Sequence, residues 1–233
     1  MDSGEQRLRA VLAQTAGETG LDEEAIEVIV DHAQIAYFRE GATIDRAGVK
    51  AGLSKFVLSG VVRLMFEGAR QGPMVVQFVK PGLPLISIME EGRRSSFSSV
   101  AHGPAGIAFV SHELIAEVVA QLGADRAARF ARYSWSALSG LVRDKCELLT
   151  GSVSDRLLHE LGILAGDFGR RHGDDTLIDL ALTQEHLAQL VVVDRSTVNR
   201  NLRDLEKAGY VSRSNGRYVL CAGKHSGAML RAS

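Results

Sequence analysis

The spacing of apolar residues changes along the chain. Between residues 35 and 110 the apolar positions form short runs separated by glycines, which is the pattern of short strands joined by turns. This part is therefore predicted to be an all-β roll or barrel, with a tight hairpin at Leu58-Ser59-Gly60-Val61. The predicted strands are Ile35–Phe38, Phe56–Leu58, Val61–Phe66, Met74–Val79 and Ile107–Val110.

Helices are predicted on both sides of this β part. Leu21–Ile35 has apolar residues at helical spacing, and Asp22 can cap it. Over Ala124–Leu149, apolar and small residues recur at steps of three and four, the spacing of a coiled-coil seam. This stripe can pack on the chain's own β domain or pair with a second copy. The small residues at its centre favour pairing, and the polar Asp144 on the same stripe argues against it. The proposed seam residues are Phe130, Ala137, Leu141 and Leu148.

The last third of the chain predicts a helix-turn-helix. An amphipathic helix over Ser152–Phe168 and a polar loop, Gly169–Asp175, come first. Thr183 can then cap a short helix that ends at Val191. After a two-residue turn, Asp194 can cap a second helix that runs to about Ala208, where Gly209 ends it.

The second of these helices has two contrasting faces. Val198, Leu202 and Leu205 share one face at helical spacing, and polar residues centre on nearly the opposite face. Arginine can bond guanine through two hydrogen bonds, asparagine can do the same with adenine, and a helix N-terminus can hold a phosphate. The helix is therefore predicted to read the major groove. Its proposed DNA-contacting residues are Arg195, Ser196, Thr197, Asn199, Arg200 and Arg203.

A basic hairpin is predicted behind this helix. Asn215-Gly216 lies between two short β-prone runs, which is the strongest short hairpin signal. Arg213 and Arg217 flank the turn. A basic hairpin in this place is typical of a wing that touches the DNA backbone or minor groove.

Charge and composition limit the other possibilities. Residues 1–40 hold nine acidic and three basic side chains, whereas residues 181–220 hold four acidic and six basic ones, which fits an anion-binding surface near the C-terminus. No apolar run approaches the ~18 residues of a membrane span, and the first residues lack the pattern of a secretory signal, so a cytoplasmic protein is expected. Cys146 and Cys221 alone cannot form a metal framework.

The sequence resembles the superfamily of the cyclic-AMP receptor protein and FNR, which are bacterial transcription regulators. The resemblance is strongest in LTQEHLAQLVVVDRSTVNRNLRDLEKAGYVSRSNGRYVL and continues in FREGATIDRAG, FVLSGVVRLMF and Pro81-Gly82. It implies an α+β fold: a double-stranded β-helix, or jelly roll, of the cyclic-nucleotide-binding kind as a sensor domain (residues 1–123), a dimerisation helix (124–150) and a winged helix-turn-helix (151–233). It also implies a homodimer on double-stranded DNA, with half-sites about one helical turn apart, and RNA polymerase as a further partner.

The resemblance also assigns roles to individual residues. Arg195 and Arg200 fall at the family's guanine-reading and adjacent arginines, and Thr197 falls at its phosphate contact. Ser196 stands where many members carry a base-reading glutamate, so the preferred DNA site can differ. Val192 stands where a turn glycine is usual. A β-branched residue disfavours positive φ, so this turn is expected to be reshaped.

The sensor part departs from cyclic-nucleotide binders. The family's Gly-Glu-Leu is absent between Gly82 and Gly92, and Arg94-Ser95-Ser96 only partly matches its phosphate-binding segment. Arg143 and Asp144 replace the Thr-Ser pair that reads adenine. Cyclic AMP is therefore not expected, no cofactor or metal is predicted, and the effector is unknown. If an effector pocket exists, its proposed residues are Arg94, Ser95, Arg143 and Asp144.

Other functions remain as alternatives. The roll could respond to another nucleotide, such as a cyclic dinucleotide, or bind haem through His102 or His112. A four-cysteine iron–sulfur cluster is excluded within one chain, because there are two cysteines. A cupin-type enzyme is a remote alternative, since it needs a His-x-His and glutamate cluster that is absent between residues 35 and 110. The protein is therefore not expected to be an enzyme.

Overall fold

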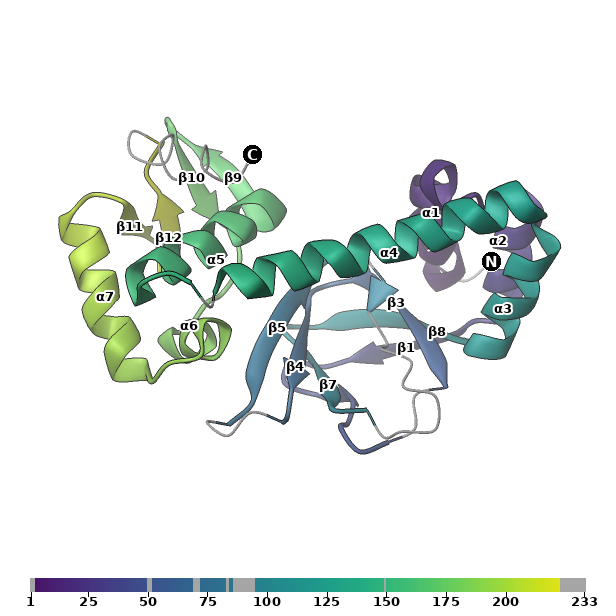
Figure 1. Cartoon of the computed structure of the whole chain (residues 1–233), viewed down its shortest axis with the longest axis horizontal. Coiled ribbons are helices and arrows are strands. Elements are labelled where there is room, and N and C mark those ends of the chain that lie inside the picture. The colour runs from purple at the N-terminus through teal and green to yellow at the C-terminus, as the bar shows by residue number, and fades with distance from the viewer. Residues whose placement is uncertain are drawn as a thin grey trace. The chain divides into compact units, whose positions relative to one another are not determined.

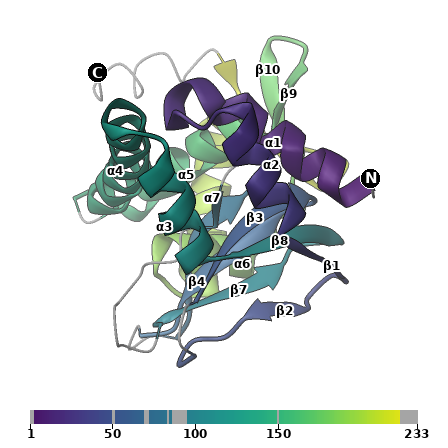
Figure 2. The ribbon, with the colours of Figure 1, turned by 90° about the vertical axis from the view of Figure 1, so that its right-hand side faces the viewer.

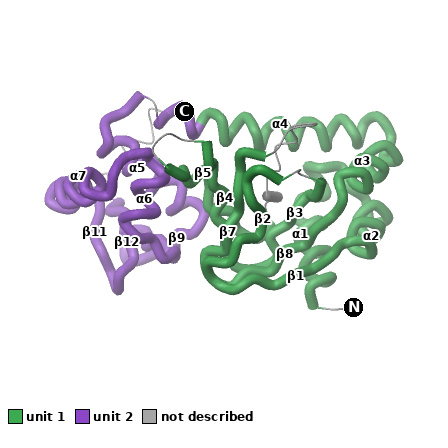
Figure 3. Tube along the Cα trace, turned by 90° about the horizontal axis from the view of Figure 1, so that it is seen from below, with its two compact units in different colours: residues 1–143 green, residues 144–233 purple. Residues whose placement is uncertain are grey.

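The structure is a computed structural model that describes residues 3–49, 52–68, 72–82, 84–85, 95–148 and 150–222. These residues form two compact units, residues 1–143 and 144–233 (Figure 3). The division falls within the long helix α4 (Ala124–Glu147). Helix α4 continues through this boundary (Figure 1), whereas the predicted domains give it as a segment of its own, residues 124–150. Among the described helices, none has the length and hydropathy needed to cross a membrane.

The first unit contains a roll of two four-stranded antiparallel sheets, as the glycine-punctuated apolar runs predicted. One sheet has the order β1-β8-β3-β6 and the other has the order β2-β7-β4-β5. The first consists of β1 (Gln34–Phe38), β8 (Ala105–Ser111), β3 (Leu53–Ser59) and β6 (Pro84–Leu85), and the second of β2 (Thr43–Asp45), β7 (Phe97–Ala101), β4 (Val62–Phe66) and β5 (Met74–Val79).

The predicted hairpin at residues 58–61 is wrong. The strands on either side of it, β3 and β4, belong to different sheets: β3 pairs with β8 and β6, and β4 pairs with β5 and β7. The chain crosses between the sheets at Gly60, which has a φ of +73°. A Cβ there would lie 2.1 Å from the carbonyl oxygen of Pro104. The glycine therefore serves a close backbone approach between strands rather than a hairpin turn.

Two separate apolar clusters hold the first unit together. The inner cluster lies between the sheets and includes the buried side chains of Val57, Val62 and Ile107. The outer cluster joins the first sheet to α1 (Ser3–Thr19), α2 (Glu23–Asp31) and α3 (His112–Gln121), which cover that sheet in Figure 2. The predicted cap of α2 is confirmed, since the Asp22 carboxylate accepts a hydrogen bond from the Ala25 amide at 2.9 Å. Helix α1 was not expected from the sequence.

The predicted seam residues of α4 have some contacts within their own chain. Leu141 packs against the inner cluster of the roll, Phe130 and Ala137 line a pocket of the first unit, and Leu148 is buried in the second unit. These contacts do not decide between the two interpretations, because Ala137 is exposed and Phe130 and Leu141 are only partly buried, so the seam stays a prediction. The large apolar side chains that α4 exposes are one position away, at Trp135 (71% exposed) and Val142 (54% exposed).

The second unit packs three helices on one antiparallel sheet. Its helices are α5 (Val153–Phe168), α6 (Gln184–Val191) and α7 (Arg195–Lys207), and its sheet has the order β11-β12-β10-β9. The predicted polar loop over residues 169–175 is wrong, because β9 (Gly169–His172) and β10 (Asp175–Ile178) form a hairpin there. The wing is a second hairpin, formed by β11 (Val211–Ser214) and β12 (Arg217–Leu220). Because β10 pairs with β12, the two hairpins share one sheet.

A buried ion pair joins the end of α4 to α5 within the second unit. The Lys145 ammonium donates to the Glu160 carboxylate at 2.6 Å, and the Glu160 side chain is 3% exposed. Burial raises the pKa of the Glu160 carboxyl, and the Lys145 charge opposes this shift. Removing one partner of such a pair is more costly than replacing both, because it leaves a charge in a poorly solvated place.

Lys145→Met is therefore expected to lower the free energy of unfolding by roughly 3 kcal/mol near pH 7, a magnitude typical of a broken buried pair. The loss should shrink at acidic pH, since the protonated Glu160 carries no charge to desolvate. Urea unfolding at two pH values measures both effects. The control is Lys145→Met combined with Glu160→Gln, which should recover much of the stability. Equal destabilisation by the single and the double variant would contradict the role of the pair.

Candidate nucleic-acid interface

The two helices of the predicted helix-turn-helix begin where the sequence placed them. The Thr183 hydroxyl accepts a hydrogen bond from the His186 amide at 3.1 Å and caps α6. The Asp194 carboxylate accepts from the Thr197 amide at 2.9 Å and caps α7. Gly209 follows α7 with a φ of +76°. Residues with good capping side chains thus fix both helix starts, and a glycine follows the second helix.

The turn between these helices is not reshaped, contrary to the expectation from Val192. That residue takes the left-handed conformation, with φ 55° and ψ 56°, and its amide donates to the Ala188 carbonyl. A β-branched residue there is strained, because its Cβ crowds the following carbonyl oxygen. The turn therefore keeps the geometry that a glycine would allow, and the backbone of Val192 carries the strain.

The two faces of α7 are as predicted. Val198, Leu202 and Leu205 are 0%, 1% and 5% exposed and form its inward face. Arg195, Arg200 and Arg203 are exposed. Within the described residues, no ion pair or side-chain hydrogen bond holds these three guanidinium groups, so they are available to an external acceptor.

The other proposed contacts on α7 are already engaged. Asn199 is half-buried, and its side-chain oxygen accepts a hydrogen bond from Gln184 at 3.1 Å. The hydroxyls of Ser196 and Thr197 both donate to the Asp194 carboxylate, the second at 2.7 Å. These hydrogen bonds hold the pKa of the Asp194 carboxyl well below its usual range. The bond from Ser196 has the largest effect, followed by those from Thr197. A carboxylate thus occupies the helix N-terminus where a phosphate was predicted.

The hairpin predicted at Asn215-Gly216 is confirmed. Strands β11 and β12 pair in register, with Ser214 opposite Arg217, and both turn residues have positive φ. The two wing arginines are paired within the chain. Arg213 donates to Glu206 at 3.2 Å and to the Tyr218 hydroxyl at 2.8 Å, and its guanidinium lies 4.3 Å from the Tyr218 ring centre. Arg217 lies 3.8 Å from Asp179.

The β9–β10 hairpin adds a second basic element that the sequence analysis missed. Arg170 and Arg171 on β9 are exposed, and Arg170 forms an ion pair with Asp179 at 3.2 Å. Asp179 is therefore shared between Arg170 of one hairpin and Arg217 of the other. All four residues of β9 are exposed. The strand therefore lacks the alternation of apolar and polar residues that would predict it from the sequence.

The proposed effector pocket stays a prediction. Arg94 lies outside the described residues. Ser95 uses its hydroxyl locally, accepting from the Phe97 amide at 3.0 Å. Arg143 is exposed in the first unit, and Asp144 is half-buried at the start of the second.

The buried cation of the described roll is Lys55, which the sequence analysis did not single out. It is 5% exposed and donates to Asp45 at 2.5 Å. Because its charge is already paired, an anionic ligand would have to compete with Asp45 for it.

The two histidines named for haem have different surroundings. His102 lies edge-on to the Phe78 ring, with the ring centres 5.0 Å apart. His112 lines an apolar pocket on the helical side of the first sheet, and burial lowers its pKa, with the Lys55 charge adding to this shift. Within the described residues, no group of three or more His, Cys, Asp or Glu side chains is arranged to hold a metal ion.

The capped helix pair, the outward arginines of α7 and the basic hairpin define a winged helix-turn-helix protein that binds DNA. Residues 155–222 match the Crp-like helix-turn-helix domain. A CRP-like cAMP-activated global transcriptional regulator of Mycobacterium tuberculosis is 25% identical over 215 residues, which cover 90% of this chain and 93% of that protein. Residues 155–222 are therefore a Crp-like helix-turn-helix domain, and nearly the whole chain is similar to a CRP-like transcriptional regulator.

Solved structures agree in fold. The c-di-GMP responsive global regulator CLP of Xanthomonas campestris superposes with a TM-score of 0.71 at 20% identity, covering 85% of this chain and 99% of that one. A CooA mutant from Carboxydothermus hydrogenoformans also has a TM-score of 0.71, at 17% identity, covering 92% and 93%.

The strained turn gives a direct test of the local geometry. Val192→Gly is expected to stabilise the second unit by roughly 0.5–1 kcal/mol, because relief of the left-handed strain exceeds the entropic cost of glycine. Thermal unfolding measures the change. Val193→Gly is the matched control: Val193 has no positive φ, so the same substitution there should destabilise. Destabilisation by both variants would show that Val192 is not strained in solution.

Proposed function

We propose that this regulator binds its operator as a homodimer in the cytoplasm, with α7 in the major groove and Arg195, Arg200 and Arg203 directed at the DNA. The observation that carries the proposal is the contrast between the two faces of α7. Three nearly inaccessible aliphatic side chains fix the helix, and three arginines without a partner in the described chain extend from the other side. Guanidinium groups with free donors suit guanine O6 and N7, or backbone phosphates.

The proposed contacts fall into two groups. Arg200 and Arg203 lie along the exposed face of α7 and suit base edges. Arg213 and Arg217 on the wing are held by Glu206 and Asp179, so they suit the backbone, where a rigid positive charge needs no exact base geometry. The hydroxyls of Ser196 and Thr197 can donate to DNA only if it displaces the Asp194 carboxylate, whereas Asn199 keeps the donors of its side-chain NH2 group.

Arg200→Ala should therefore weaken operator binding by about 1–3 kcal/mol and relax the sequence preference at one position of each half-site. The operator is first selected from random duplexes with the unaltered protein, and affinities are then measured for the operator and a scrambled duplex. Arg217→Ala is the comparison: it should weaken both duplexes alike and reduce the salt dependence. If Arg200→Ala kept the discrimination between the two duplexes, α7 would not read bases through this residue.

The homodimer is proposed through α4, with a seam one position away from the one predicted. Trp135 and Val142 are seven residues apart and exposed, and Ala128, Ala131 and Ser139 share their side of the helix. A neighbouring arc of α4, with Arg129, Arg132 and Arg143, is polar and exposed. Large exposed apolar side chains next to small ones suit a close helix–helix contact.

Trp135→Glu is expected to give a monomer, because the dimer would bury two opposing carboxylates without partners. Light scattering coupled to gel filtration measures the mass. Ser136→Glu places the same charge on the polar arc and should remain dimeric. Circular dichroism should show the same helix content for both variants, since Trp135 is 71% exposed within the chain. A dimeric Trp135→Glu protein would rule out this seam.

The proposal includes an effector other than cyclic AMP, and no catalytic role. Its support is the inner cluster of the roll, where aliphatic and aromatic side chains fill the space between the sheets and Lys55 is already paired with Asp45. RNA polymerase remains a proposed partner.

A further inference from the structure

A hollow among the described residues lies outside the roll, on the opposite face of its first sheet. It has a volume of about 600 Å³ and is lined by α1, β3, α3 and α4, all in the first unit. This volume is in the range of pockets that enclose small-molecule ligands. Phe56 from β3 and Phe130 from α4 are among its lining side chains, together with many aliphatic residues. The hollow is therefore separate from the space between the two sheets.

We propose that this pocket binds an uncharged, largely apolar small molecule that carries one hydroxyl or carbonyl group. None of the described side chains that line it is Asp, Glu, Lys or Arg, and burial and the Lys55 charge lower the pKa of the lining residue His112, which favours its neutral form. A carboxylate or phosphate would therefore be buried without a counter-charge, at a high cost in free energy.

The polar groups of the pocket indicate where the polar group of the ligand would bind. Three hydroxyls are already satisfied by their own helices: those of Thr15, Thr19 and Ser134 donate to backbone carbonyls at 3.3, 2.9 and 3.0 Å. The Ser54 hydroxyl, the His112 ring and the Tyr133 phenol also line the pocket, and we assign the polar group of the ligand to the Tyr133 phenol. Burial raises its pKa, and the Glu18 charge adds to this shift, so it is a neutral donor at physiological pH and its surroundings disfavour an anion.

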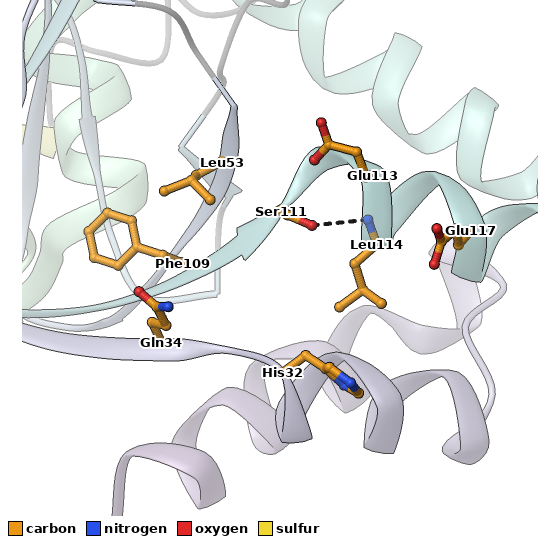
Figure 4. A pocket seen from close by; sticks show the side chains of 8 residues that line it. All are labelled: His32, Gln34, Leu53, Phe109, Ser111, Glu113, Leu114 and Glu117. Atoms are coloured by element: carbon orange, nitrogen blue, oxygen red, sulfur yellow. Dashed lines mark hydrogen bonds between the residues drawn. The ribbon is translucent and has the colours of Figure 1, made fainter.

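The second pocket of the first unit does not offer comparable chemistry. It has a volume of about 420 Å³ and is lined by Glu113 and Glu117, one turn apart on the exposed side of α3 (Figure 4). The Ser111 hydroxyl at its centre already accepts from the Leu114 amide at 3.1 Å. Its carboxylates do not converge in Figure 4, and they belong to a solvated surface.

The apolar pocket also contacts the helix on which dimerisation is proposed to depend. α4 contributes Phe130, Tyr133, Ser134, Ala137 and Leu138 to the lining, and Leu138 lies beside the proposed seam. A bound ligand would thus touch the helix that carries Trp135 and Val142. This link to regulation rests on the proposed function, whereas ligand binding itself does not.

The test uses the full-length protein and Nile red, a neutral apolar dye whose fluorescence rises in apolar surroundings. One saturable site per chain is expected. Ala116→Phe, which fills the pocket from α3, should weaken dye binding by about tenfold or more, since an overfilled site loses at least ~1.4 kcal/mol. Ala120→Phe is the matched control on the same helix outside the lining, and it should bind as the unaltered protein does. If Ala116→Phe fails to fold, Ala137→Phe fills the pocket from α4.

Displacement of the dye then tests the charge of the ligand. Dodecanol should displace it at a concentration about tenfold or more below that of dodecanoate at pH 8, because the carboxylate finds no cation in the pocket. Tyr133→Phe should weaken dodecanol several-fold and leave the dye unaffected. Unchanged dye binding in both filled variants, or equal displacement by the alcohol and the acid, would overturn the proposal. Neither assay involves DNA, so its failure would leave the operator-binding proposal intact.

Discussion

The DNA-binding surface depends on the burial of one face of α7. Val198, Leu202 and Leu205 are almost inaccessible, and complete burial of such a side chain contributes roughly 1.5–3 kcal/mol. Since these three residues share one face, the helix can rotate about its axis only by exposing them. Their burial thus fixes the direction of the arginines, which make no stabilising contact in the described chain. Packing also explains the strain at Val192. The buried faces of α6 and α7 fix the turn between the two helices, so Val192 must adopt the left-handed conformation that this turn requires.

Local sequence signals predicted the second unit well. The caps at Thr183 and Asp194, the apolar spacing of α7 and the Asn-Gly turn each act over a few residues, so the sequence alone identifies them. The prediction of a hairpin at Gly60 was wrong because the contact that decides it is distant in sequence. A glycine between two strands is compatible with a hairpin and with a passage between sheets. The deciding contact is with Pro104, which is more than forty residues away in the sequence. The β9–β10 hairpin was missed because its first strand is exposed throughout and shows no alternation.

The apolar spacing of the long helix α4 identifies a helix but does not identify what its apolar residues pack against. Two apolar stripes run along α4, one position apart. The predicted stripe contains Leu141, which packs against the inner cluster of the roll, and Phe130, which lines the apolar pocket. The second contains Trp135 and Val142 and is exposed. Periodicity alone cannot distinguish a stripe that packs within the chain from one that packs between chains, because both bury apolar surface. Only the position of the roll relative to the helix, which arises from contacts distant in sequence, separates the two.

The N-terminus of α7 combines two requirements that oppose each other. The negative charge of Asp194 favours the helix start through the helix dipole and through hydrogen bonds from Ser196 and Thr197. The same charge repels a phosphate at this point, although the amides of a helix N-terminus are otherwise a good phosphate site. A phosphate here would compete with Asp194 for the hydroxyl donors of Ser196 and Thr197, and the unfavourable charge of Asp194 would remain. Attraction of the DNA backbone at this end therefore has to come from a group that reaches beyond the cap, and Arg195, exposed and next to Asp194, is placed to supply it.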